Sequence, residues 1–231
     1  MKRRFTILLL TLSTVITLFA QNKHSDSIML AAYLSEDMSV WREYVDDPTH
    51  LSPLTTDFLF YEYGFCGYMV DRDKAHALPY VKRYKQHVES LRQLLPAGHY
   101  EMYLSAAYVY ELRLHESMHP LKAMNMAKDA AQKAPNDPLV LAYYGTSLFY
   151  APKPFGSKQE ALKYFEKAEL LSRDRKWHDC WIRPNVMMYI AQCYAKTGNT
   201  SAAISWSQDI LREYPDYLYI RNTFLPALQA E

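Results

Sequence analysis

The sequence predicts an all-helical fold, built as an array of antiparallel helix pairs. Apolar residues recur at steps of three and four, which is the period of a helix that buries one face. One such series is Leu139, Leu141, Ala142, Gly145, Leu148 and Phe149, and the next is Ala161, Leu162, Phe165, Ala168 and Leu171. Alternating runs of the β type are missing, and only 6 of the 231 residues are Gly. A third observation is an internal repeat, found by laying the chain over itself.

Residues 1–20 have the pattern of a secretory signal peptide. Three basic residues, Lys2 to Arg4, precede an apolar run from Phe5 to Leu18, and the small residue Ala20 precedes an expected cut at Gln21. The alternative is a retained membrane anchor, although the run is shorter than the ~20 residues that a spanning helix needs. We therefore expect an exported protein of the periplasm or cell envelope.

The charge balance argues against a nucleic-acid partner. Removing the signal peptide takes 3 of the 26 basic residues and none of the 25 acidic ones, so the net charge falls from +1 to −2. Nucleic-acid binding needs a basic footprint. No second long apolar segment follows, so we expect no stable membrane insertion after signal cleavage. Cys180 and Cys193 can form a disulfide in an oxidising compartment, or all three cysteines can be buried as small hydrophobes; both alternatives stay open.

The N-terminal region, residues 21–98, reads as helical. The periodicity predicts helices over Ser27–Leu34, Glu36–Val45, Leu54–Val70 and Lys74–Leu95, with Pro79 either bending the last helix or limiting its start. Pro96 to His99 form a clear break. Residues 61–95 can hold a degenerate repeat, because Gly64, Ala77 and Tyr84 fit its small and aromatic positions in more than one register.

Residues 99–231 contain three repeat units and a closing helix. At an offset of 38 residues, Ala107 falls on Gly145, Ala123 on Ala161 and Ala130 on Ala168. A third unit repeats these roles with Ala191, Tyr194, Gly198, Ala203 and Pro215. Small residues at these places let two antiparallel helices approach closely. Residues 216–231 then form the closing helix that such arrays require at their ends.

This spacing resembles the tetratricopeptide repeat (TPR), a helix-turn-helix unit of about 34 residues. The third unit follows the family pattern most closely, apart from Ser207 and Ile210. The segment "LFYAPKPFGSKQEALKYFEKA" and the Trp-containing linker after it are also similar to exported TPR-like proteins of Bacteroides-type bacteria. These resemblances imply a TPR-like α-α solenoid that is not an enzyme, mediates protein–protein interaction in the envelope and needs no cofactor.

The segment His115-Glu116-Ser117-Met118-His119 is an H-E-x-x-H match, which on a helix would indicate a zinc peptidase. The repeat argues against a helix, because the offset of 38 places it on the loop Lys153–Ser157. Pro120 disfavours helical geometry at His119 and fits the first residue of the next helix. No third ligand is evident in sequence, so zinc catalysis stays a distant alternative.

Two further segments contain residue types that could bind a metal or act as a nucleophile, but we expect both to have structural roles. Trp177, His178, Asp179, Cys180 and Trp181, with Cys193 downstream, contain metal-ligand types but match no known ligand spacing. We expect Trp177 and Trp181 to fill the space left by the longer connection between repeats. Cys66 lies on an apolar helix face without a basic neighbour, which indicates an inert thiol.

The resemblance also suggests a partner-binding groove lined by the first helix of each repeat. Carrying over the groove positions gives Glu101, Tyr108, Glu111, Thr146, Phe149, Asn185, Gln192 and Lys196. The enlarged loops His115–Pro120 and Ala151–Lys158 are expected to contribute. A protein or peptide partner is the favoured ligand; the alternative is a glycan- or peptide-binding accessory protein, since the 20 tyrosines could line an aromatic groove. The sequence leaves the partner's identity and the oligomeric state open.

Overall fold

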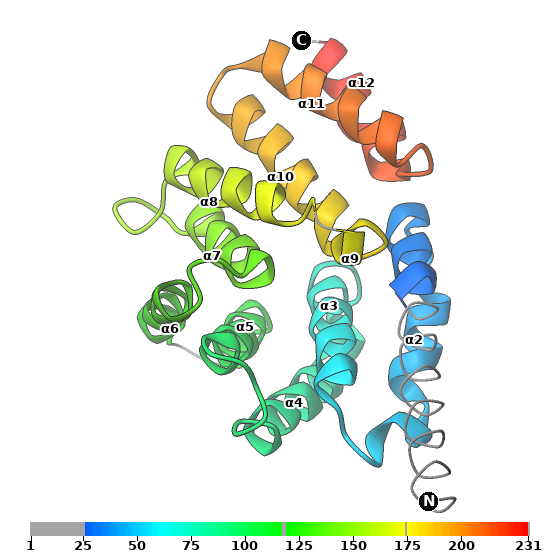
Figure 1. Ribbon diagram of the computed structural model, residues 1–231, viewed down its shortest axis with the longest axis vertical. Helices are drawn as coiled ribbons and strands as arrows, with labels where there is room; N and C mark the ends of the chain where they lie inside the picture. The colour runs from blue at the N-terminus through cyan, green and yellow to red at the C-terminus, as the bar shows by residue number, and fades with distance from the viewer. Residues whose placement is uncertain (1–25, 117–118, 174, 231) are drawn as a thin grey trace, which may run out of the picture.

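The computed structural model describes residues 26–116, 119–173 and 175–230, and within these ranges every regular element is helical (Figure 1). The predicted signal peptide, residues 1–20, lies outside the described part of the chain. Consecutive helices pack as pairs: α3 (Thr56–Arg72) with α4 (Lys74–Ser90), α5 (His99–Arg113) with α6 (Pro120–Lys133), α7 (Pro138–Tyr150) with α8 (Lys158–Leu171), and α10 (Ile182–Lys196) with α11 (Thr200–Glu213). The predicted all-helical array of helix pairs is confirmed.

In the described part of the N-terminal region, residues 26–35 are helical, which confirms the helix predicted for Ser27–Leu34. It is followed by α2 (Ser39–Asp46) and a short 3-10 helix, η1 (Pro48–Leu51). The prediction that the second helix begins at Glu36 is wrong by three residues. Glu36 has a φ of 57°, a left-handed conformation that a right-handed helix cannot contain.

Local capping and turns explain the other shifted boundaries. The Thr55 hydroxyl accepts a hydrogen bond from the Phe58 N–H at 3.1 Å, so α3 starts at Thr56 rather than Leu54. Helix α4 ends at Ser90 rather than Leu95, and turns lead to Gly98. Helix α4 also continues through Pro79, so the alternative that Pro79 limits its start is wrong.

The small residues of the repeat allow the close helix approach that the spacing predicts. Ala107, Ala130, Ala168 and Ala191 are fully buried. A Cβ added at Gly145 on α7 would lie 2.9 Å from the Phe165 ring on α8, within the same pair. In the N-terminal region Gly64 packs instead against two indoles, those of Trp41 and Trp181. That residues 61–95 are a degenerate repeat stays a prediction.

Trp181 fills the space at the junction between repeats, as predicted. It follows the short α9 (Arg175–His178) and is 6% exposed. Its ring centroid lies 5.6 Å from that of Trp41, 5.5 Å from that of Phe60 and 6.0 Å from that of Tyr63. Trp177 is half-buried against the same core. The longer linker therefore places an aromatic side chain in the core.

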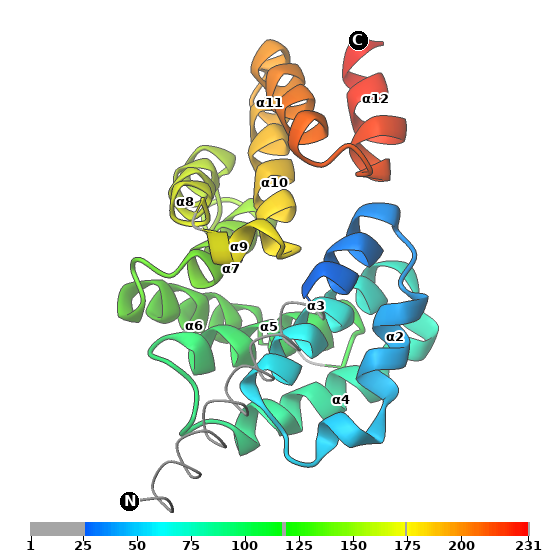
Figure 2. The ribbon, with the colours of Figure 1, turned by 45° about the vertical axis from the view of Figure 1, so that its right-hand side comes forward.

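The helix over residues 26–35 connects the first helix pair with the last, beside α3 and α10 (Figure 2). Asp26, the first described residue, accepts a hydrogen bond from the Tyr61 hydroxyl of α3 at 2.6 Å. Near its end, the Asn185 amide of α10 donates to the Tyr33 hydroxyl at 2.9 Å. These contacts join segments that are far apart in sequence.

The C-terminal closing helix is also confirmed, with an irregular turn. Residues 218–229 are helical and contain the π-helical segment η2 (Ile220–Phe224) followed by α12 (Leu225–Gln229). The Leu225 N–H donates to the carbonyl of Ile220, five residues back. The wide turn lies just before Pro226, which has no N–H and would crowd the carbonyl four residues earlier in a regular helix.

The three cysteines are free and buried, which is the small-hydrophobe alternative rather than a disulfide between Cys180 and Cys193. Burial raises the pKa of each thiol, to about 12 for Cys180 and Cys193, because the thiolate loses its hydration. None of the helices in the described ranges is both long and apolar enough to cross a bilayer.

Candidate protein-interaction surface

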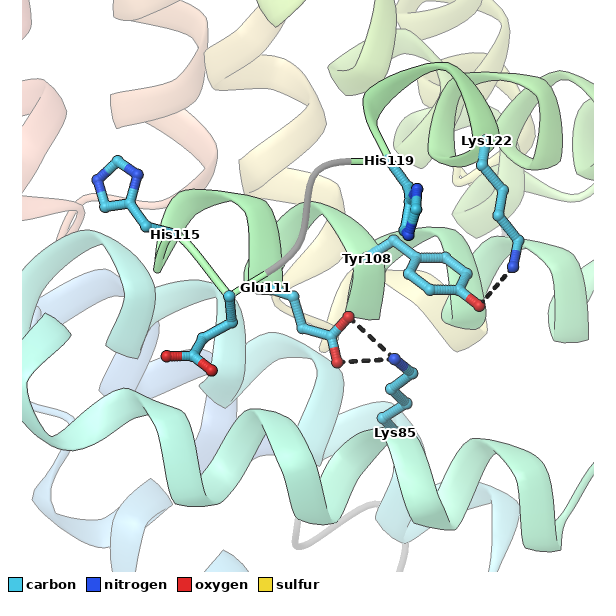
Figure 3. Close-up of a pocket in the computed structure, with 7 residues that line it drawn as sticks. Lys85, Tyr108, Glu111, His115, His119 and Lys122 are labelled. Carbon is cyan, nitrogen blue, oxygen red and sulfur yellow. Dashed lines mark hydrogen bonds and ion pairs between the residues drawn. The ribbon is translucent and has the colours of Figure 1, made fainter.

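A polar surface depression of about 440 Å³ lies where α4, α5 and α6 meet (Figure 3). Its lining residues are Lys85, Tyr108, Glu111, His115, Glu116, His119 and Lys122. Helix α4 supplies Lys85, and α5 supplies Tyr108 and Glu111, which the helical period places on one side. The connection between α5 and α6 supplies both histidines and Glu116. The depression is therefore built at the edge where the two helices of one repeat are joined.

Two lysines lie against the ring of Tyr108, which lines the depression. The ammonium nitrogens of Lys85 and Lys122 are 4.6 and 4.4 Å from the centroid of its ring. Lys122 also donates to the Tyr108 hydroxyl at 2.7 Å. Lys85 forms a two-pronged ion pair with Glu111, at 2.7 and 2.9 Å. An ammonium over a ring face is attracted to the ring quadrupole, so these side chains hold a defined arrangement.

The charges of the depression suit a polar protein surface. Two lysines balance two glutamates when the histidines are neutral, so no strong field of one sign develops. The connection residues His115, Glu116 and His119 and the nearby Lys122 are exposed, while Tyr108 and Glu111 are half-buried. Such a set can exchange hydrogen bonds and ion pairs with a partner of mixed charge, which is typical of the rim of a protein interface.

The H-E-x-x-H match lies in a connection between helices, as the repeat predicted. Helix α5 ends at Arg113, His115 has a φ of 62°, His119 is the N-cap of α6 and Pro120 is its first residue. Ser117 and Met118 lie outside the described residues. Figure 3 shows His115 pointing away from His119. Among the described side chains, no group of three or more His, Cys, Asp or Glu is arranged to hold a metal ion.

The predicted groove residues of α5 and α7 do not meet in one place. Tyr108 and Glu111 line the depression described above, whereas Glu101 lines a second, smaller hollow and pairs with Lys133 of α6. The Thr146 hydroxyl donates to the carbonyl of Ala142 in its own helix at 2.9 Å. Phe149 is only 5% exposed, so it offers little area to a ligand. That these residues contact a partner stays a prediction.

The predicted groove residues of α10 are partly covered by the chain itself. Asn185 donates to Tyr33 of the N-terminal helix. Gln192 donates to the Tyr219 hydroxyl of the closing segment at 3.3 Å. Lys196, in the last turn of α10, is exposed. Some of the tyrosines lie in the core and not on a surface, since Tyr84, Tyr103 and Tyr143 are buried. That other tyrosines line an aromatic groove stays a prediction.

Sequence reasoning missed two features of this surface. It did not select Lys85 or Lys122, because the pairing of their side chains with Tyr108 depends on three separate helices. It also did not place the helix over residues 26–35 on α10. A weak signal existed for that helix: Met29, Ala32 and Leu34 are apolar at near-helical spacing and are buried in the structure.

The fold and its surface define a class: this chain is a TPR-like α-α solenoid with a C-terminal closing helix. One solved structure to which it is similar is TTC0263, a thermophilic TPR protein of Thermus thermophilus. The two share 18% sequence identity with a TM-score of 0.60, over 91% of this chain and 99% of that one. No protein-family model matches the sequence, and no significant match to a curated protein was found. The similarity to this structure confirms the predicted fold, and at 18% identity it shows the fold but does not by itself show a function.

Proposed function

We propose that this chain is an exported, non-catalytic scaffold that binds a protein partner in the cell envelope. The observation that supports the proposal most is the TPR-like fold over 91% of the chain, because proteins with this fold are generally non-enzymatic scaffolds for protein interaction. Export follows from the signal-like pattern of residues 1–20. The Bacteroides-type resemblance of the segment around Phe155 and of the linker after it agrees with an envelope location.

The partner would contact the edge of the array that carries the two enlarged connections, His115–Pro120 and Ala151–Lys158. The sequence offset of 38 residues makes these connections equivalent positions of successive repeats, so we expect them on one edge. The first borders the polar depression around Tyr108. The second exposes apolar surface, since Phe155 is 53% exposed and the adjoining Tyr150 is 63% exposed. Apolar rings beside a polar rim are the usual composition of a protein interface.

Site-specific photo-cross-linking tests this proposal. A photoreactive residue replaces Glu116 beside the depression or, as the matched control, the exposed Lys167 on α8, and each variant is expressed in the native host. We expect one defined adduct at position 116, lost when Tyr108→Ala is added, and no such adduct at position 167. Identical adduct patterns at both positions, or none at either, would contradict the proposed edge.

Export is tested separately. Sequencing the N-terminus of protein recovered from the envelope fraction should find a mature chain that starts at Gln21. A chain found only in the cytoplasm with residues 1–20 intact would contradict the export proposal.

A further inference from the structure

The N-terminal helix over residues 26–35 covers a face that the repeat fold would otherwise leave open. This face, which we call the α10 seam, consists of Trp181, Asn185 and Tyr217. The Tyr33 ring lies 5.9 Å from the Trp181 ring and 5.4 Å from the Tyr217 ring. Its hydroxyl accepts from Asn185 at 2.9 Å and lies 2.6 Å from the Tyr217 hydroxyl. A single short helix thus occupies part of the position predicted for a partner.

One polar atom in the α10 seam has no partner while the helix is in place. The indole nitrogen of Trp181 is buried and has no hydrogen-bond acceptor, whereas the neighbouring Trp41 indole donates to the carbonyl of Tyr61 at 3.0 Å. A buried donor without an acceptor loses its hydration and destabilises the arrangement that buries it. The structure with the helix in place therefore leaves the Trp181 indole N–H unsatisfied, and a ligand that offers a hydrogen-bond acceptor at this position would satisfy it.

The order of the covering helix depends on the side chains against which it packs. Residues 26–35 are the described part of this helix, and short isolated helices are marginal in water, so these residues keep their helical order through contacts with the rest of the chain. Residues 36–38 alone connect it to α2, and Glu36 in that connection is exposed. Met29 and Ala32 are buried in the main core, and Leu34 packs in a small cluster with Met187 and Ile220. A helix that replaces this one must therefore supply apolar side chains at the same spacing.

We propose that the α10 seam is a docking site for an amphipathic helix of a protein partner, and that residues 26–35 are an intramolecular substitute which that helix replaces. This inference rests on the proposed scaffold function. The partner helix presents an aromatic side chain to Asn185, as Tyr33 does, and a carboxylate or amide oxygen to the Trp181 indole. Tethering raises the effective concentration of the chain's own helix to the order of millimolar, so only a better-matched helix displaces it.

A labelled synthetic peptide with the sequence of residues 26–35 is the probe, and fluorescence anisotropy measures its binding to the full mature chain. Leu34→Asp weakens the internal helix, and Leu170→Asp, at a position 60% exposed on α8, is the matched control for the new charge. We expect the peptide to bind the Leu34→Asp protein at least tenfold more tightly than the wild type or the control. Adding Asn185→Ala should then weaken binding about three- to tenfold, the value of one hydrogen bond.

Equal peptide binding by all three proteins, or no binding by a folded Leu34→Asp protein, would overturn the proposal. If Leu34→Asp does not fold, as judged by circular dichroism, Tyr33→Phe replaces it with a smaller expected gain of about threefold. Hydrogen exchange on the wild type gives an independent check. Amides of residues 29–35 should exchange through local opening, and protection equal to that of the α10 interior would also overturn the inference.

The result can be separated from failure of the proposed function. If the peptide does not bind but the cross-linked adduct at position 116 persists, this docking site fails while the scaffold function stands. A concentration-dependent dimer of the wild type that Leu34→Asp abolishes would overturn the partner assignment, because the seam would then exchange helices between copies of this chain.

Discussion

Arg183 offers a quantitative test of how consecutive repeats are joined. It is 8% exposed at the start of α10 and contacts carboxylates on two other helices. Its guanidinium donates to Glu213 of α11 at 2.8 and 2.9 Å, and to Glu169 of α8 at 3.1 Å. Burial raises the pKa of Glu213, but the hydrogen bonds and the positive charge of Arg183, with smaller contributions from Tyr214 and His178, together hold this pKa below 4.5. Changing Arg183→Met keeps most of the volume and removes the charge.

The expected loss of unfolding free energy is about 2–3 kcal/mol. Breaking a buried ion pair from one side costs roughly 3–5 kcal/mol, because a charge is left without compensation. Two features reduce this value here. Arg173 still pairs with Glu169 at 2.9 Å, and the Glu213 side chain is 26% exposed, so water can solvate it. The matched control is Arg212→Met, since Arg212 is 76% exposed and its pair with Asp209 should contribute no more than about 0.5 kcal/mol.

Urea denaturation followed by circular dichroism measures both variants. The same measurement at several pH values tests whether the ionised Glu213 carboxylate contributes to stability. Because the folded-state pKa of Glu213 is lowered, its contribution is present above its ordinary value of 4.5 and is lost as the pH falls through the folded value. The gap between the wild type and Arg183→Met should therefore shrink below about pH 4. If Arg183→Met destabilises no more than Arg212→Met at pH 7, the idea that this network joins the repeats is refuted.

Three other predictions follow from the geometry. Gly98→Ala should destabilise the fold at least twice as much as the control Gly198→Ala, which should lose about 1–2 kcal/mol of unfolding free energy. Both glycines have a φ above 80°, but only at Gly98 would an added Cβ meet a backbone oxygen, that of Ala130 at 2.7 Å. Equal shifts of the melting temperature in the two variants would contradict the clash. All 3 thiols should react with a thiol reagent in denaturant at pH 8 but react slowly in the native protein, because they are buried and burial raises the pKa of each thiol. Fast labelling of the native protein would contradict this burial. Elemental analysis should find no near-stoichiometric zinc, because His115 and His119 point apart; zinc that is lost in a His115→Ala, His119→Ala variant would revive the peptidase alternative.

The local pattern of the sequence was sufficient for the helix pairs and for the fate of the H-E-x-x-H match. Helical period, small residues and proline restrictions act over a few residues, so Pro120 and Gly145 could be assigned before any contact was known. The boundaries at Glu36 and Thr56 were missed because a left-handed residue and a side-chain cap decide them. The groove residues were assigned by position in the repeat, and that assignment could not say which of them the chain covers itself.

By itself, the sequence determined an all-helical repeat array, its near-neutral charge and an inter-helix connection at His115–Pro120. Only the tertiary structure decided that Lys85 and Lys122 lie against Tyr108, and that Tyr33 lies on Asn185, which is 152 residues away. The physical reason is that such contacts depend on the packing angles of successive pairs, whose small rotations add up along a solenoid. Local patterns specify each pair, but the accumulated curvature decides whether Tyr33 can reach Asn185 and Tyr217.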